Sequence, residues 1–288
     1  MKSAKTFPYK SGDWELDCLP DDGARLRRLS FKGIELLTEY PGNFRSPAKD
    51  FGLYETRPVY GYDDCFPTVD SCKYPGLDWR IPDHGELCWK KWEVSEAEKS
   101  IEFSVTSEKV PICFTRKMLF EDNILRWRFS ALNKGMQNLP FLHVMHPLMP
   151  LDAVKSFSLP EFSSVYDETE KGEILLTPLE IKKLLLELPP GKFKMLILRN
   201  IDSGSFSLEF KNELKLQVDF PHELFPSLGV WWNNSAYPDE TGGRRCECAF
   251  EPIPGTCSSL AKAWDDKSCM NVGASESFDW EIIWTVNI

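Results

Sequence analysis

The side chains best able to exchange a proton near neutral pH are few in this sequence. It contains four histidines, His84, His143, His146 and His222, and an unperturbed histidine has a pKa of about 6.5. His84 follows a loop rich in Pro, Gly and Asp. His146 closes an apolar segment directly before Pro147, which disfavours helix at the preceding residue. We therefore expect a strand to end at His146, at the mouth of a sandwich.

A carboxylate supplies the third candidate, Glu251 in the segment CECAFEPIPG. Alternation along this segment places Glu251 on the face opposite Phe250, and Pro252 is expected to end the strand. A carboxyl group beside an apolar run can have its pKa raised by desolvation, which suits a general base. Glu247 lies on the same face and is expected to be an exposed strand charge.

Each candidate also has an ordinary structural interpretation. His84 can cap a turn, His146 can be a hydrogen-bonded residue at a strand end, and Glu251 can face solvent. His143 lies three residues before His146 and is the alternative acid, since a regular strand points it to the other face. His222, in DFPHELFP, is expected to lie in a loop with no catalytic part.

The cysteines provide no clear metal-binding pattern. Cys246 and Cys248 are separated by one residue, and one segment with His84 contains Cys65, Cys72 and Cys88. Neither arrangement repeats a pair of closely spaced ligands, as structural zinc sites do. We therefore expect no metal.

Composition excludes several partners and indicates a compartment. The nine cysteines are an odd number without a repeated spacing, and the amino-terminal segment lacks the apolar run of a secretory signal. Free thiols in a reducing cytoplasm are the expectation. No stretch approaches the roughly 18 apolar residues of a membrane span. The net charge of −10 argues against a nucleic-acid partner, although a local basic cluster can still bind a phosphosugar.

Elements that position these residues are mostly strands with one buried face. Alternating apolar residues recur at 101–105, 125–131 and 278–286, and FSLEFKNELKLQVDF predicts two strands joined by a tight turn at KNE. One short helix is predicted near 178–188, where Thr177 and Glu180 form a capping box around Pro178. Leu185, Leu186 and Leu188 are expected to face inward. The pattern predicts a single all-β domain over residues 1–288, of antiparallel sandwich type.

Five segments, taken in order, resemble the galactose mutarotase-like or aldose 1-epimerase superfamily. FPTVDSCKYPGLDWRIPDHGELCWKKWEV, with His84, resembles the region of its HG motif. LHVMHPLMP, with His146, resembles its second histidine motif, and CECAFEPIPG, with Glu251, its catalytic-glutamate motif. GARLRRLSFKGIELL resembles the opening hairpin and VGASESFDWEIIWTV the closing strand. The resemblance runs over nearly the whole chain, and the shared order makes it more specific than any single motif.

The resemblance implies a β-supersandwich with an open cleft on one sheet and no cofactor. Glu251 would take the proton from the anomeric hydroxyl, His146 would act as general acid at the ring oxygen, and His84 would hold and polarise the same region. Such an isomerase needs one acid and one base. It would interconvert the anomers of an aldose or a hexose 6-phosphate, as a monomer or homodimer.

The sequence departs from the family in two motifs. Cys88 stands where relatives with an HGFAR-like motif carry arginine, and HPLMP lacks the aromatic residues common after the second histidine. Arg57 is the nearest match to an arginine before the first histidine, at a slightly longer spacing. We expect Arg57 and Asp83 to contact substrate, and Trp79, Trp89 or Trp231 to present a flat apolar face to a sugar.

Two other functions remain open at this point. A glycoside hydrolase would use paired carboxylates, such as Glu251 with Asp83 or Glu86. A noncatalytic carbohydrate-binding protein would keep the cleft without turnover. Basic residues around the first histidine are either surface charge or a phosphate clamp: Lys73, Arg80, Lys90 and Lys91.

Overall fold

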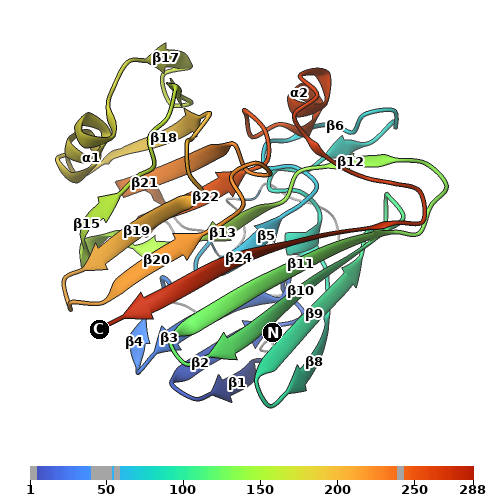
Figure 1. The fold of residues 1–288 in the computed structure, drawn as a ribbon, viewed down its shortest axis with the longest axis horizontal. Coiled ribbons are helices and arrows are strands. Elements are labelled where there is room, and N and C mark those ends of the chain that lie inside the picture. The colour runs from blue at the N-terminus through green and yellow to red at the C-terminus, as the bar shows by residue number, and fades with distance from the viewer. Residues whose placement is uncertain (1–4, 40–53, 55–58, 239–242) are drawn as a thin grey trace.

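The computed structural model describes residues 5–39, 54, 59–238 and 243–288, and most of them form antiparallel β-sheet (Figure 1). An eight-stranded sheet crosses the front of Figure 1. Its strands, in spatial order, are β15 (Val154–Ser158), β19 (Ser205–Phe210), β20 (Lys215–Asp219), β24 (Ser277–Asn287), β11 (Ile124–Asn133), β10 (Ile112–Glu121), β9 (Ser100–Thr106) and β8 (Glu93–Ala97).

Two further sheets provide the strands that carry the candidate residues. The first is ordered β1 (Phe7–Ser11), β2 (Trp14–Leu19), β3 (Arg25–Phe31), β5 (Tyr62–Cys65) and β13 (Val144–Pro147), with β4 (Ile34–Glu35) also paired to β3. The second is ordered β14 (Met149–Pro150), β22 (Arg244–Ile253), β21 (Ser227–Pro238), β18 (Lys192–Arg199), β16 (Ser164–Asp167) and β17 (Gly172–Ile174). Contacts between β13 and β22 join the two sheets.

Smaller elements complete the described chain. Two-stranded sheets pair β6 (Cys72–Lys73) with β7 (Arg80–Ile81), and β12 (Leu139–Phe141) with β23 (Met270–Val272). Short 3-10 turns occur at Leu87–Trp89 and Leu151–Ala153. The α-helices are α1 (Pro178–Leu186) and α2 (Leu260–Asp265). Their nine and six residues fall well short of the roughly 20 needed to cross a bilayer, and no described helix has that length and apolarity.

The predicted all-β sandwich is confirmed, and so is the alternation on which it rests. Buried side chains alternate along β9, β11 and β24, and large aromatic residues such as Trp127, Phe129 and Trp284 lie in the core. Burying one phenylalanine side chain contributes about 1.5–3 kcal/mol. The hairpin at β19 and β20 forms with Ser205 opposite Asp219, as the alternation predicts.

Helix α1 begins and is capped as predicted, but fewer of its leucines face inward than predicted. Thr177 accepts a hydrogen bond from the Glu180 amide while the Glu180 carboxylate accepts one from the Thr177 amide. Leu185 is buried, Leu188 is half-buried, and Leu186 is exposed because it follows Leu185 around the helix by 100°. The prediction of a single helix was also wrong, since α2 forms near the carboxyl end.

Two strands end close to the prolines that were expected to end them. Pro147 is the last residue of β13, where it pairs with Tyr62, and Pro252 pairs with Leu228 one residue before the end of β22. A proline removes one amide donor from the ladder, which suits a position near a strand end. His146 and Glu251 each precede such a proline and are still paired, with Asp63 of β5 and Gly229 of β21.

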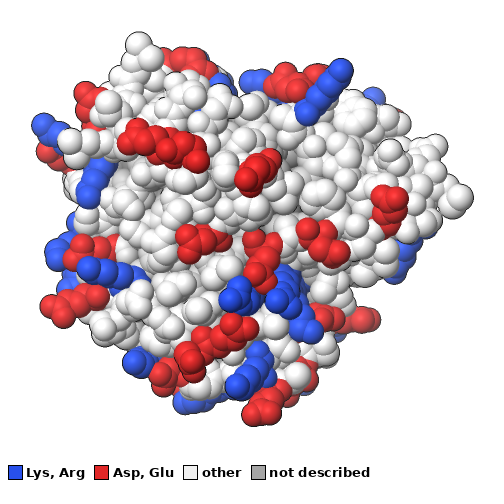
Figure 2. Space-filling view, viewed as in Figure 1, with Lys and Arg blue, Asp and Glu red and all other residues white. Residues whose placement is uncertain are grey.

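Acidic and basic side chains alternate on the outer face of the large sheet (Figure 2). Arg126 and Arg128 both pair with Glu281 across β11 and β24, and Lys117 pairs with Glu102 across β10 and β9. This face therefore presents mixed charge instead of the continuous basic surface that nucleic acids select.

A buried charged cluster connects the large sheet to β5. The Arg116 guanidinium on β10 donates to the Asp64 carboxylate on β5 and to the Ala24 carbonyl. Tyr62 and His143 contact the other carboxylate oxygen of Asp64. All four of these side chains are fully buried, so each charge depends on its partners.

Removing the Asp64 carboxylate is expected to destabilise the fold strongly. Asp64→Ala should lower the free energy of unfolding by about 3–5 kcal/mol, because Arg116 then keeps a buried charge without its partner. Urea denaturation measures this. The matched control is Glu102→Ala, which removes the ion pair between Glu102 on β9 and Lys117 on β10. The side chains of Lys117 and Glu102 are 40% and 42% exposed. The control should therefore lower the free energy of unfolding by less than about 1 kcal/mol. Equal losses in both variants would contradict the expectation.

Candidate functional site

Strand β5 directs two adjacent carboxylates to opposite faces of its sheet. Because successive side chains alternate, Asp64 points into the core, whereas Asp63 points to the other side, where it lies opposite His146 in the β5–β13 ladder. Asp63 is buried and accepts a hydrogen bond of 2.9 Å from Arg25, which itself is buried and also paired with Asp22. Asp63 is thus an anchored anion directly beside a histidine.

His146 is oriented by this anchored carboxylate. Its Nδ1 lies 2.9 Å from Asp63 Oδ1, and the Tyr54 hydroxyl lies 3.1 Å from the same nitrogen. A carboxylate only accepts hydrogen bonds, so Nδ1 carries the hydrogen and Nε2 is left for the pocket. Nε2 lies 3.8 Å from Glu251 Oε1. Burial lowers the pKa of His146, and this outweighs the opposing effect of Asp63.

His84 is held by a tight loop packed against the end of β5. Gly85 has a φ of +74°, and a Cβ there would meet the Phe66 carbonyl oxygen at 2.0 Å, so only glycine fits. Glu86 then donates its amide hydrogen to that same carbonyl. His84 itself has a φ of +58°, a conformation that costs energy in residues with a Cβ and is concentrated at functional sites.

The His84 ring is fixed by one carboxylate and one aromatic ring. Nδ1 lies 2.9 Å from Asp83 Oδ2, and the ring stacks on Tyr54 with centroids 3.6 Å apart and planes 5° from parallel. Burial acts to lower the pKa of His84, but the hydrogen bond and charge of Asp83 outweigh it and the pKa lies above its usual value. The His84 and His146 ring centroids are 5.0 Å apart.

Glu251 faces these histidines from β22. As the alternation predicted, Phe250 points into the core, where it stacks on Phe206, and Glu251 points the other way. Only 4% of Glu251 is exposed. Burial raises the pKa of Glu251 to about 8, and the nearby His84 reduces this effect only in part. A carboxyl group with this pKa can both hold and release a proton near neutrality.

The three side chains line one cavity of about 370 Å³, within the size range of small-molecule pockets. One wall is aromatic. The centroid of the Phe193 ring lies 5.4 Å from that of Trp231 and 4.7 Å from that of Tyr237. The remaining residues that line the cavity are both polar and apolar: Tyr54, Val59, Val69, Asp70, Leu148, Glu168, Thr169, Met195, Arg245 and Ser258.

A second carboxyl group of this pocket is also perturbed. Burial and the charge of Asp70 raise the pKa of Glu168 to about 7, and the Ser258 hydroxyl donates to it over 3.2 Å. Arg245 brings a positive charge into the lining, and its guanidinium donates to Glu247. The pocket thus combines three carboxyl groups with raised pKa values, those of Asp70, Glu168 and Glu251, with two histidines and an aromatic wall.

Solved structures share this fold over nearly the whole chain. A protein from Synechocystis superposes with a TM-score of 0.76 at 16% identity, covering 99% of this chain and 96% of that one. An Escherichia coli protein, described provisionally as an aldose 1-epimerase, gives 0.74 at 16% identity and covers 99% of both chains. A galactose mutarotase related enzyme from Lactobacillus acidophilus gives 0.69 at 16% identity, with 99% and 98% covered. The chain has the galactose mutarotase-like fold.

This fold was predicted from five motifs, and at 16% identity the structural neighbours establish the fold alone. No family model matches the sequence, and no curated protein sequence matches it. Within the galactose mutarotase-like fold, the chemistry of this chain must therefore be argued from its own pocket.

The predicted substrate-binding residues separate into three groups. Trp231 lines the pocket, while its neighbour Trp232 is buried against Phe157. Asp83 lies beside the pocket as the hydrogen-bond partner of His84. Trp79 stacks on Tyr74 instead and is not among the described residues that line the cavity. Arg57 lies outside the described residues.

The basic cluster near His84 does not reach the cavity among the residues that the structure describes. Lys73 and Lys91 are exposed and pair with Asp78 and Asp21. Lys90 pairs with Glu108. The surface-charge interpretation fits these residues better than a phosphate clamp.

Two other assignments are decided by burial. His143 bonds to Asp64 among the core aromatic rings Phe129 and Trp280, away from the pocket. Glu247 was expected to be exposed but is buried, and its carboxylate accepts hydrogen bonds from Arg245 and from side chains of β21.

Glu86 does not line the pocket either. Its carboxylate is buried and accepts hydrogen bonds from the Ser107 hydroxyl and the Glu108 amide. It is therefore engaged in supporting the His84 loop and is not positioned as the second carboxylate of a hydrolase.

Several residues of this site were missed by sequence reasoning. Tyr54, Asp63 and Glu168 contact or line the pocket, and none was a candidate. The sequence did indicate a buried aspartate at Asp63–Asp64, because two consecutive acids in a short strand between aromatic residues must place one of them toward the core. Nothing in the sequence around Glu168 indicated a site residue, because its neighbours in the pocket come from distant segments.

The raised pKa of Glu251 predicts a pH effect on stability. Between about pH 4.5 and 8 the folded protein holds this proton and the unfolded chain does not, so the free energy of unfolding should fall as pH rises through this window. Glu251→Gln should flatten that slope. Urea denaturation of both proteins from pH 5 to about pH 8 measures the two slopes. Because both proteins contain Glu168, its contribution cancels when one slope is subtracted from the other. Parallel slopes would contradict the raised pKa.

Proposed function

We propose that this protein is an aldose 1-epimerase that interconverts the α and β anomers of an aldose. The observation that carries the proposal is the placement of His146 Nε2 and the Glu251 carboxyl group 3.8 Å apart across one cavity. Anomerisation requires one acid and one base at the hemiacetal centre, and these two groups are oriented toward the same small volume.

The acid–base step uses a single proton shared by this pair. Burial raises the pKa of Glu251 and lowers that of His146, so near neutral pH the two groups hold one transferable proton between them. When it resides on His146, the Glu251 carboxylate removes the anomeric hydroxyl proton as His146 protonates the ring oxygen. The bond between C1 and the ring oxygen breaks to give the aldehyde. Rotation about C1–C2 and closure on the other face complete the exchange.

His84 and the aromatic wall hold the sugar in this proposal. His84, with its pKa raised by Asp83, offers a hydrogen-bond donor beside the reacting centre. Trp231 and Phe193 provide flat apolar surface for the C–H face of a pyranose. The indole N–H of Trp231 points to Glu247 at 3.4 Å, which fixes the plane of that ring. A pocket built this way fits a small neutral sugar.

Glycoside hydrolysis is the second candidate, and one observation favours keeping it. Glu168 and Glu251 both line the cavity and have pKa values of about 7 and about 8, and hydrolases use two carboxyl groups of unequal pKa. The histidine pair is unexplained by that chemistry. NMR of a sugar mixture separates the two: accelerated α/β exchange supports the epimerase, and release of a reducing end supports the hydrolase.

Replacement of Glu251 tests the proposed base. Glu251→Gln should lower the exchange rate of a pure aldose anomer by at least about 100-fold, the contribution expected of a general base, while sugar binding stays measurable by titration calorimetry. The readout is saturation-transfer NMR of the anomeric protons. Wild-type turnover in this variant would remove Glu251 from the mechanism.

The acid is tested by a matched pair of histidine variants. His146→Gln should lose exchange to a similar extent, because the amide cannot donate and recover a proton at the ring oxygen. His222→Gln changes a half-exposed histidine that pairs with Glu223, and this variant should retain full activity. Loss in both variants would indicate a general defect instead of a role for His146.

A further inference from the structure

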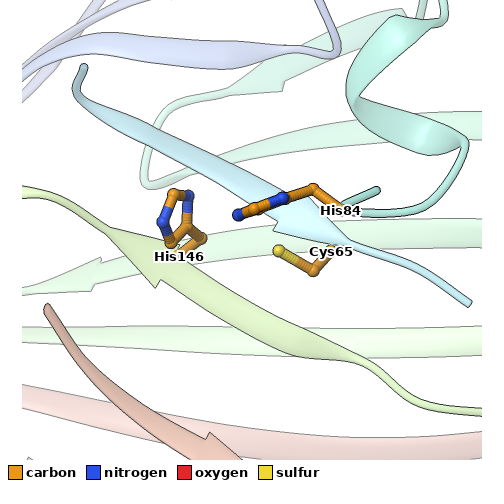
Figure 3. A group of neighbouring side chains, drawn as sticks. All are labelled: Cys65, His84 and His146. Atoms are coloured by element: carbon orange, nitrogen blue, oxygen red, sulfur yellow. The ribbon is translucent and has the colours of Figure 1, made fainter. Parts of the chain in front are cut away.

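Three side chains form a convergent set of metal-binding atoms, and two of them, His84 and His146, line the pocket. The Cys65 sulfur and one nitrogen each of His84 and His146 lie within 4.8 Å of one another. Figure 3 shows the Cys65 sulfur pointing toward the space between the two imidazole rings. The residues come from β5, from the loop after β7 and from β13, so their spacing in the sequence gave no metal motif and none was predicted.

Both histidines already have the supporting partners that metal-binding histidines use. His84 Nδ1 bonds to Asp83 and His146 Nδ1 bonds to Asp63, each over 2.9 Å. A histidine that binds a metal almost always donates its other ring N–H to such a group, which fixes the tautomer and orients the ring. In each ring the nitrogen that remains for a ligand is Nε2.

A fourth ligand would come from Glu251 or from water, because Glu251 is near one of the three donors and is not part of the convergent set. Glu251 Oε1 lies 3.8 Å from His146 Nε2, so it or a water molecule can complete a tetrahedron. In tetrahedral zinc, nitrogen and sulfur donors are about 3.3–3.6 Å apart, as bond lengths of about 2.0–2.3 Å require. The three donor atoms, which lie within 4.8 Å of one another, therefore have to move closer together when the ion binds. The mixture of one thiol with imidazoles suits zinc in preference to magnesium or calcium.

We infer that the pocket binds a Zn²⁺ ion through Cys65, His84 and His146, with Glu251 or water as the fourth ligand. The thiol proton passes to solvent as the sulfur binds, because the thiolate is the ligand form. The ion occupies His146 Nε2, the atom that the proposed epimerase needs for proton transfer. Bound zinc therefore inhibits anomerisation. This last consequence rests on the proposed function, whereas zinc binding itself does not.

Metal binding is tested on the full chain after treatment with a chelator. Titration with ZnCl₂ in competition with a chromogenic chelator should give one site per chain. Co²⁺ in its place should produce a thiolate-to-metal charge-transfer band in the near ultraviolet. Cys65→Ser should abolish that band and weaken Zn²⁺ binding by more than the roughly 10–100-fold that loss of an outer partner costs. Cys113→Ser, on β10 and half-buried, is the matched control and should keep both signals.

A second variant keeps the test decisive if Cys65→Ser does not fold. Asp83→Asn changes only the partner of His84 and should weaken Zn²⁺ binding by about 10–100-fold with the Co²⁺ band retained. Wild-type protein without a Co²⁺ thiolate band, or with equal zinc affinity in wild-type and Asp83→Asn, would overturn the inference.

The exchange assay distinguishes failure of this inference from failure of the proposed function. In chelator, wild-type protein should accelerate anomer exchange, and Zn²⁺ should remove that rate in proportion to the sites filled. Exchange that Zn²⁺ leaves unaffected at full occupancy overturns the inhibitory role. If the protein binds zinc and shows the Co²⁺ band but does not accelerate exchange in chelator, the metal site stands and the proposed epimerase function is wrong.

Discussion

Two neighbouring aspartates on one short strand connect the stability of this protein to its chemistry. Asp64 is the buried partner of Arg116, and Asp63 is the buried partner of Arg25 and His146. Taking a carboxylate out of water is costly unless charge and hydrogen bonds replace the lost solvation. Each aspartate meets this requirement with an arginine, and the two arginines come from different strands. Strand β5 is thereby fixed from both faces.

The same lack of water sets the proton affinities around the cavity. Desolvation raises the pKa of Glu251 and lowers the pKa of His146, because burial disfavours the charged form of both groups. His84 departs from this trend because Asp83 compensates its burial. The difference between the two histidines thus arises from their carboxylate partners and exposure, although both have similar hydrogen-bond geometry.

The sequence predicted what depends on local patterns and missed what depends on distant contacts. Alternation located β9, β11, β19, β20 and β24, and the capping box located α1. Family motifs singled out His84, His146 and Glu251, which share the cavity. The positions of Tyr54 and Glu168 in the site could not be predicted, because their partners lie far away along the chain.

The wrong assignment of Glu247 has a physical origin. It was taken for a surface charge because strand alternation shows which residues share a face and does not show whether that face is covered. In the folded chain, Trp231 and Asn233 of the neighbouring strand β21 donate hydrogen bonds to Glu247.

The opposed directions of Asp63 and Asp64 also restrict how this chain can change during evolution. If β5 shifted by one residue in either direction, an aspartate would leave Arg116 or Arg25, both fully buried, with a partner lost. Single-residue insertions and deletions within this strand are therefore excluded by the core, even when they would be tolerated by the pocket. Substrate preference can diversify through the surrounding loops, while the relation between Asp63 and His146 stays locked to the folding of the sheet.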